Sequence, residues 1–170
     1  MIKKEPRTLI VCVSRHLGNA LKVANAIATA LKADLISPAE FSPELAATYD
    51  LLGFGSGVYR QQLDGKIKEV VSWLPEDDSK PVFIFSTSIF GVKEPHQAIK
   101  NRLAEIHYPV IGEFSCPGKI SYSFTKVFGG LNPTRPNTSD LDEAAFFAKG
   151  LLNNPIFNEA DKNKSLLDKN

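Results

Sequence analysis

The chain has few cysteines, no long apolar segment and almost no net charge. Its 170 residues include 2 cysteines, Cys12 and Cys116, whose positions match neither a metal-ligand spacing nor a disulfide framework. We therefore expect no zinc or iron–sulfur site. No apolar run approaches the roughly 18 residues of a membrane-spanning helix, and residues 1–6 lack the apolar segment of a signal peptide. These absences lead us to expect a cytoplasmic protein that does not enter a membrane.

The charge balance limits the possible partners. The formal net charge is +1 at pH 7, from 20 Lys and Arg against 19 Asp and Glu. A protein held on nucleic acid by a broad basic face carries a larger excess, so we expect no nucleic-acid partner. Because 43% of the residues are hydrophobic, the chain is able to bury a core and fold as one domain. We expect this domain to span residues 1–152 and to be followed by a polar tail, residues 153–170.

Short apolar runs alternate with segments of helical periodicity, which is typical of an α/β domain. We expect strands at residues 8–13, 33–37, 50–56, 81–85 and 108–114. Helices are expected from residue 19 to 31, briefly after Ser42 and Pro43, through Trp73, at 95–106 and at 139–152, where Ser139 would cap the last one. One apolar face of the first helix would comprise Leu21, Val23, Ala24, Ile27, Ala28 and Leu31.

Successive right-handed β-α-β units give an open parallel sheet with helices on both faces. In such a doubly wound sheet, ligands bind at the carboxyl ends of the strands, so the residues that follow each strand are the candidates for a site. The first group consists of Ser14, Arg15, His16, Leu17, Gly18, Asn19 and Ala20. The second consists of Ser56, Gly57, Val58 and Tyr59. The third consists of Ser86, Thr87, Ser88, Ile89, Phe90 and Gly91.

The first of these groups joins a strand to a helix and is suited to hold a phosphate. The first amides of a helix have no intrahelical acceptor and lie at the positive end of the helix dipole, so a phosphate placed there gains several charge-assisted hydrogen bonds. An ordinary polar loop between strand and helix is the other interpretation of this segment. Arg15 and His16 would either add charged hydrogen bonds to the phosphate or lie in solvent.

Taken together, these segments resemble the flavodoxin family. The resemblance covers about residues 8–152 and is carried by Gly18-Asn19 with the helix 22–27, by residues 50–59 and by residues 83–88. It implies a five-stranded parallel sheet of order 2-1-3-4-5 that binds FMN in the loops after strands one, three and four. The first loop would hold the FMN phosphate. Tyr59 and Phe90 would lie against the isoalloxazine ring, although Phe90 would equally suit packing under its own loop.

Other chemistries that use α/β folds lack their residues here. No lysine follows glycines in the pattern of a P-loop, and Gly53, Gly55 and Gly57 do not have the spacing of a dinucleotide fingerprint. Phe54 and Val58 flank Ser56 where a nucleophile elbow requires glycine. Cys116 is expected at the same edge of the sheet as the three loops, where it is either a redox-active thiol or a small apolar filler.

The resemblance implies an electron carrier in which FMN performs the redox chemistry, so no catalytic side chain and no metal is expected. Its partners would be redox proteins or a small-molecule electron donor or acceptor. The first alternative is an FMN-dependent NAD(P)H or quinone reductase, because the chain is near neutral and several cations would surround the cofactor. The second is a flavin-free interaction module, because Leu17 and Ala20 occupy positions where hydroxyl residues are common in the family.

Overall fold

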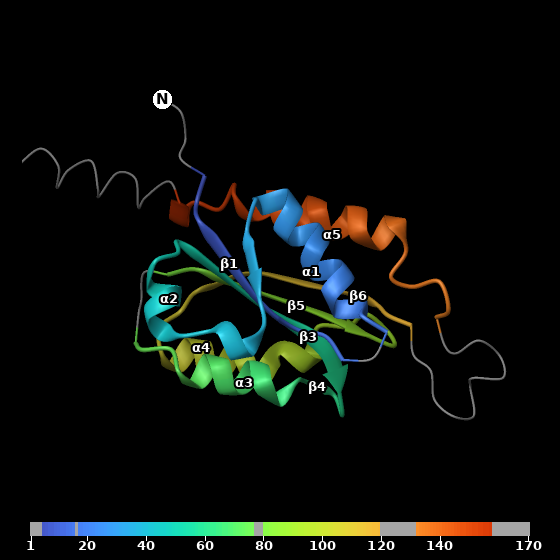
Figure 1. Ribbon diagram of the computed structural model, residues 1–170, viewed down its shortest axis with the longest axis horizontal. Helices are drawn as coiled ribbons and strands as arrows, with labels where there is room; N and C mark the ends of the chain where they lie inside the picture. The colour runs from blue at the N-terminus through green and yellow to red at the C-terminus, as the bar shows by residue number, and fades with distance from the viewer. Residues whose placement is uncertain (1–4, 16, 77–79, 120–131, 158–170) are drawn as a thin grey trace, which may run out of the picture.

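The computed structural model describes residues 5–15, 17–76, 80–119 and 132–157, which form a sheet covered by helices on both faces (Figure 1). The strands are β1 (Thr8–Val13), β2 (Asp34–Ile36), β3 (Leu51–Tyr59), β4 (Gln62–Leu63), β5 (Val82–Ser88) and β6 (Val110–Pro117). Five of them run parallel in the order β2-β1-β3-β5-β6, while β4 pairs antiparallel with β3. Since β5 and β6 are the fourth and fifth parallel strands along the chain, the predicted order 2-1-3-4-5 is confirmed.

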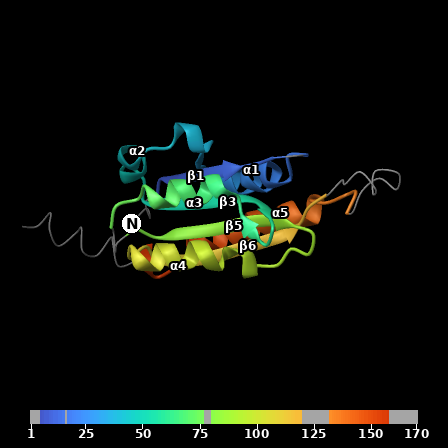
Figure 2. The same ribbon diagram turned by 90° about the horizontal axis from the view of Figure 1, so that it is seen from below.

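The helices divide between the two faces of the sheet. They are α1 (Asn19–Leu31), α2 (Pro43–Ala47), α3 (Gly65–Ser72), α4 (Gln97–Glu105) and α5 (Thr138–Leu151), with 3-10 turns η1 (Pro38–Glu40) and η2 (Glu94–His96). Helices α1 and α5 cover one face, and α3 and α4 cover the other (Figure 2). Successive strand residues serve opposite faces, so Ile10, Phe83 and Phe85 pack toward α1 and α5, whereas Leu9, Phe54 and Ile84 pack toward α3 and α4.

Strand β3 contains small residues where its neighbour β5 carries large ones. A Cβ added to Gly53 would lie 2.2 Å from a ring carbon of Phe83, and one added to Gly55 would lie 2.2 Å from a ring carbon of Phe85. Both rings are completely buried, and they pack against each other with their centroids 6.3 Å apart. The glycines therefore make room for the aromatic layer under α1 and α5.

The third strand is longer than predicted. Strand β3 continues past Ser56 to Tyr59, and the chain then turns through Arg60 and Gln61 into β4, so the second predicted loop is largely strand. The hairpin forms because Val58 pairs with Leu63, whose side chain is buried. Strand β5 likewise continues to Ser88 and includes the first half of the third predicted group.

Two helix details also differ from prediction. Leu21 is 45% exposed, whereas the rest of the predicted apolar face of α1 is buried, because the buried stripe of the helix begins at Ala20 and Leu21 lies about 100° away from it. Helix α5 is capped by Asn137 rather than Ser139. Asn137 Oδ1 accepts from the Asp140 amide at 3.1 Å, and Asp140 Oδ2 accepts from the Asn137 amide at 2.8 Å. Of the predicted tail, residues 158–170 lie outside the described residues.

Candidate functional site

The loop between β1 and α1 leads the chain through two left-handed residues into the helix. Leu17 has φ 54° and Gly18 has φ 69°, and Gly18 is the N-cap residue of α1. Ser14 Oγ accepts from the Leu21 amide at 3.2 Å, so the serine hydroxyl supports the first turn. The amides of Asn19 and Ala20 donate to no acceptor within the described part of the chain, and a Cβ at Gly18 would meet no atom within 4 Å. His16 lies outside the described residues.

Asn19 joins this loop to the segment after β6. Its Nδ2 donates to the Lys119 carbonyl at 2.6 Å, which fixes the orientation of the carboxamide. The other atom, Oδ1, is buried and accepts from no donor in residues 5–15, 17–76, 80–119 or 132–157. A buried amide oxygen without a donor is energetically unfavourable, so Asn19 Oδ1 is suited to accept from a hydroxyl or amide of a ligand.

Arg15 is paired with a carboxylate. Its Nε lies 2.5 Å from Asp64 Oδ2, and its Nη2 lies 3.1 Å from Asp64 Oδ1. The Asp64 side chain is buried and also accepts from the Lys66 amide at 2.9 Å, which makes it the N-cap of α3. The Arg15 side chain therefore ties the first loop to α3, and its expected contact with a phosphate stays a prediction.

The predicted second group lies beside this ion pair. Ser56 is fully buried, where its Oγ donates to the Gly57 carbonyl at 2.7 Å and accepts from the Asp64 amide at 2.9 Å. Tyr59 Oη donates to the Arg15 carbonyl at 3.5 Å, so Tyr59 bridges the β3–β4 hairpin and the first loop. Burial and the nearby Asp64 carboxylate raise the pKa of Tyr59. Val58 and Gly57 are partly exposed at the same edge.

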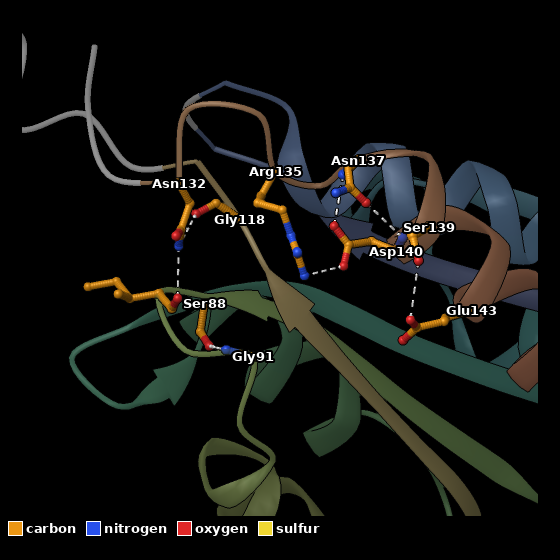
Figure 3. Close-up of polar contacts among 10 residues, drawn as sticks. Ser88, Gly91, Gly118, Asn132, Arg135, Asn137, Ser139, Asp140 and Glu143 are labelled. Atoms are coloured by element: carbon orange, nitrogen blue, oxygen red, sulfur yellow. Dashed lines mark hydrogen bonds and ion pairs between the residues drawn. The ribbon is translucent and has the colours of Figure 1, made fainter. Parts of the chain in front are cut away.

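The third group is anchored by hydrogen bonds to the chain that follows β6 (Figure 3). Ser88 Oγ accepts from the Gly91 amide at 2.8 Å, and the Ser88 carbonyl accepts from the Gly118 amide at 2.8 Å. Asn132 Nδ2 donates to the Ile89 carbonyl at 2.8 Å. Phe90 is 79% exposed, so of its two interpretations the packing of its ring under the loop is wrong, and the ring is available to a ligand.

Ser86 belongs to a buried network that the sequence reasoning missed. Ser86 Oγ lies 2.8 Å from His96 Nε2 and 3.0 Å from Ser115 Oγ. His96 Nδ1 lies 3.0 Å from Glu113 Oε1, whose Oε2 accepts from Lys100 at 2.9 Å. Glu113 is the residue of the sequence that could have indicated this network. It is a charged residue inside a mainly apolar strand, and a charged residue in that position requires a partner within the protein.

Burial determines the charge state of this network. Burial lowers the pKa of His96, although Glu113 acts in the opposite direction. Burial alone would raise the pKa of Glu113, but hydrogen bonds from Lys100 and His96 outweigh it and lower the pKa below its usual value. The order serine, histidine, glutamate is that of a hydrolytic triad, but the Ser86 and His96 side chains have no exposed surface. The network therefore supports the ends of β5 and β6 rather than a reacting substrate.

Neither cysteine has the environment of a reactive thiol. Cys12 and Cys116 are buried free cysteines in the core under α1 and α5, and burial raises the pKa of each to about 12.

Within the described residues, no three His, Cys, Asp or Glu side chains are grouped as metal ligands. None of the helices in the described ranges combines the length and apolar character needed to cross a membrane.

No family model matches the chain. A sequence relative is the uncharacterized protein MJ0298 of Methanocaldococcus jannaschii, 36% identical over 150 residues that cover 87% of this chain and 99% of the relative. A flavodoxin from the domain Archaea has a similar structure, with a TM-score of 0.65 and 14% identity over 86% of this chain and 96% of that one. The two-electron reduced flavodoxin of Megasphaera elsdenii gives a TM-score of 0.59 and 23% identity over 84% and 98% of the chains.

Larger proteins contain a similar fold. The flavodiiron protein from Giardia intestinalis gives a TM-score of 0.62 at 14% identity, and the match covers 86% of this chain but 35% of that one. Together, the sheet order and these similarities establish a flavodoxin-like fold.

Proposed function

Since the chain belongs to the family of the uncharacterized protein MJ0298 and has a flavodoxin-like fold, we propose that it binds FMN and transfers electrons between redox partners. The observation that carries the proposal is the first loop, in which open space at Gly18 lies beside the first amides of helix α1, those of Asn19 and Ala20. No acceptor for these two amides is found in the described ranges, and a phosphate would supply one.

The residues present fit the other parts of FMN as well. Asn19 Oδ1, which has no donor among the described residues, would accept from a hydroxyl of the ribityl chain. Phe90 is exposed, and Tyr59 lies between the hairpin and the first loop, so both aromatic rings are placed at the edge where the isoalloxazine ring is expected. Bound FMN would supply the redox chemistry. The polypeptide would position the flavin and limit its access to water, acting in the cytoplasm.

The visible absorption spectrum after FMN addition and gel filtration tests the cofactor. Phe90→Ala is expected to weaken FMN binding about tenfold because one aromatic contact contributes about 1 to 3 kcal/mol. Phe146→Ala is a matched control, since Phe146 is 80% exposed on α5 and Phe90 is 79% exposed. Affinity is read from quenching of flavin fluorescence. Equal weakening by both substitutions would contradict the placement of the ring.

Two alternatives have their own readouts. A reductase is favoured by the cations at this edge, and steady oxidation of NAD(P)H by the isolated holoprotein would select it. A flavin-free module is favoured by Leu17 and Ala20, which offer no hydroxyl to a phosphate, so that Ser14 is the first-loop hydroxyl left to donate to one. Failure of a folded protein to retain FMN would select that alternative, with folding verified by circular dichroism.

A further inference from the structure

A groove of about 680 Å³ lies between the first loop, the β3–β4 hairpin and the start of α3. Its lining carries two more cationic than acidic side chains, whereas the whole chain has an excess of one. Asp64 is paired with Arg15, and Glu69 accepts from Lys66 at 2.7 Å. Arg60 and Lys68 have no acidic partner within the described residues. The groove therefore presents uncompensated positive charge.

The hairpin tip holds Arg60 in an unfavourable backbone conformation. Arg60 has φ 50° and Gln61 has φ 62°, and the left-handed region costs about 1 to 2 kcal/mol for each residue that is not glycine. A two-residue hairpin of this kind is normally built from Asn-Gly or Gly-Gly. A cation therefore lies at this tip despite the backbone cost, and backbone strain of this kind is concentrated at functional sites.

Exposed apolar side chains gather at the same edge. Of the six large hydrophobic residues that are exposed in the described chain, four lie in the loops or first helical turn after β1 and β5, namely Leu17, Leu21, Phe90 and Val92. Even if Phe90 contacts a flavin, the apolar side chains of Leu17 and Val92 have no donor with which to hydrogen-bond a phosphate. Exposed apolar side chains near a groove with an excess of positive charge are typical of a protein interface.

We propose that this edge docks an acidic electron-transfer protein, whose carboxylates would face Arg60, Lys66 and Lys68 and whose apolar surface would cover Leu17 and Val92. The inference rests on the proposed function, because it names the class of partner that exchanges electrons with the FMN. A small anionic ligand such as a dinucleotide would use the cations but would leave the exposed Leu17 and Val92 uncovered. The combination of charge and apolar surface therefore favours a protein.

Calorimetric titration with an oxidised acidic [2Fe–2S] ferredoxin tests docking without electron transfer. The test variant is Arg60→Glu/Lys66→Glu. The control is Lys32→Glu/Lys149→Glu at the other end of α1 and α5, which changes the net charge equally. Lys32 is a suitable control position, because it has a positive φ like Arg60 and forms one exposed ion pair like Lys66, and Lys149 is exposed on α5. Each variant is titrated with and without FMN.

We expect the wild-type protein to bind ferredoxin with an affinity that decreases as salt is added. The affinity is expected to decrease about tenfold in the Arg60/Lys66 variant and to change less than about twofold in the control. Leu17→Ser is expected to weaken binding without altering its salt dependence. Absence of binding at low salt, equal losses in the two charge variants or tighter binding of a basic cytochrome c would overturn the proposal. A higher KM for NADPH in the Arg60/Lys66 variant with unchanged ferredoxin binding would overturn it in favour of a nucleotide site.

The two proposals fail separately. If the wild-type protein retains no FMN, the proposed function fails, and the titration of the unloaded protein still decides whether the acidic partner docks. If FMN is retained and ferredoxin does not bind, the docking proposal alone is wrong.

Discussion

His96 is a titratable residue whose side chain has no exposed surface. Ser86 and Glu113 each contact one of its ring nitrogens, and Lys93 and Lys100 are the nearby cations. Removing the imidazole leaves the Ser86 hydroxyl and one Glu113 oxygen with one partner fewer in a buried place. Loss of a buried partner costs about 1 to 3 kcal/mol, so this network is a substantial part of a marginal stability.

The pH dependence of stability follows from the direction of the His96 pKa. Burial lowers that pKa below its ordinary 6.5, so the unfolded chain binds the proton at higher pH than the folded protein does. The contribution of neutral His96 to the free energy of unfolding is therefore complete above about pH 6.5. It is lost as the pH decreases from that value toward the lower pKa that His96 has in the folded protein. Denaturant unfolding at about pH 8 and about pH 5.5 is expected to show lower stability at the acid value.

His96→Gln separates this residue from other acid-sensitive groups. The variant is expected to be less stable at both pH values and to lose less stability on acidification. His107→Gln serves as the control, because His107 is exposed. An unchanged difference between the two pH values in His96→Gln would show that other groups cause the acid sensitivity.

At the scale of elements, Asp64 determines how α3 begins and where the first loop is held. Asp64→Ala removes the N-cap acceptor of the Lys66 amide and the partner of Arg15 together. Asp64→Asn keeps an acceptor of the same length but removes the charge. Loss of a cap typically costs about 1 to 2 kcal/mol, whereas an ion pair whose cation is more than half exposed, as Arg15 is, contributes about 0 to 1 kcal/mol. Asp64→Ala is therefore expected to be the more destabilised of the two.

Denaturant unfolding of both variants measures this difference. Arg15→Gln, which removes the ion pair but leaves the cap, is expected to resemble Asp64→Asn. If Asp64→Asn were as unstable as Asp64→Ala, the charge rather than the cap would be the main contribution of Asp64.

The elements themselves were largely predictable from sequence, and the reason is the burial of the sheet. Strands β1 and β5 are covered on both faces and therefore appear as short apolar runs between amphipathic helices. The hairpin β3–β4 was missed because Arg60-Gln61 lacks the glycine or asparagine that usually marks such a turn. The Arg15–Asp64 pair was missed because its members are 49 residues apart, and pairing over that distance depends on the completed fold.

At the scale of the whole molecule, charge and apolar surface are distributed unevenly even though the net charge is close to zero. The carboxyl edge of the sheet collects exposed cations and exposed apolar side chains, while the acids beside them, Asp64 and Asp140, are buried in ion pairs with Arg15 and Arg135. Composition alone could not reveal that exposed cations and buried acids lie at the same edge, because this arrangement depends on which acids the fold buries. The sequence did predict that this edge holds the candidate site, since ligands bind there in open parallel sheets.

The two thiols report on opening of the whole core. Cys12 in β1 and Cys116 in β6 are buried in the same layer under α1 and α5, and burial raises the pKa of each to about 12. A thiol-disulfide reagent attacks as fast as thiolate becomes accessible, so labelling is expected to be slow in the native state and to accelerate in parallel with denaturant unfolding. Ellman's reagent measures the rate, and Cys12→Ala and Cys116→Ala assign it to each residue. Rapid labelling of Cys116 in a protein with intact secondary structure would show instead that the end of β6 opens locally, and would restore the possibility of a redox-active thiol at this edge.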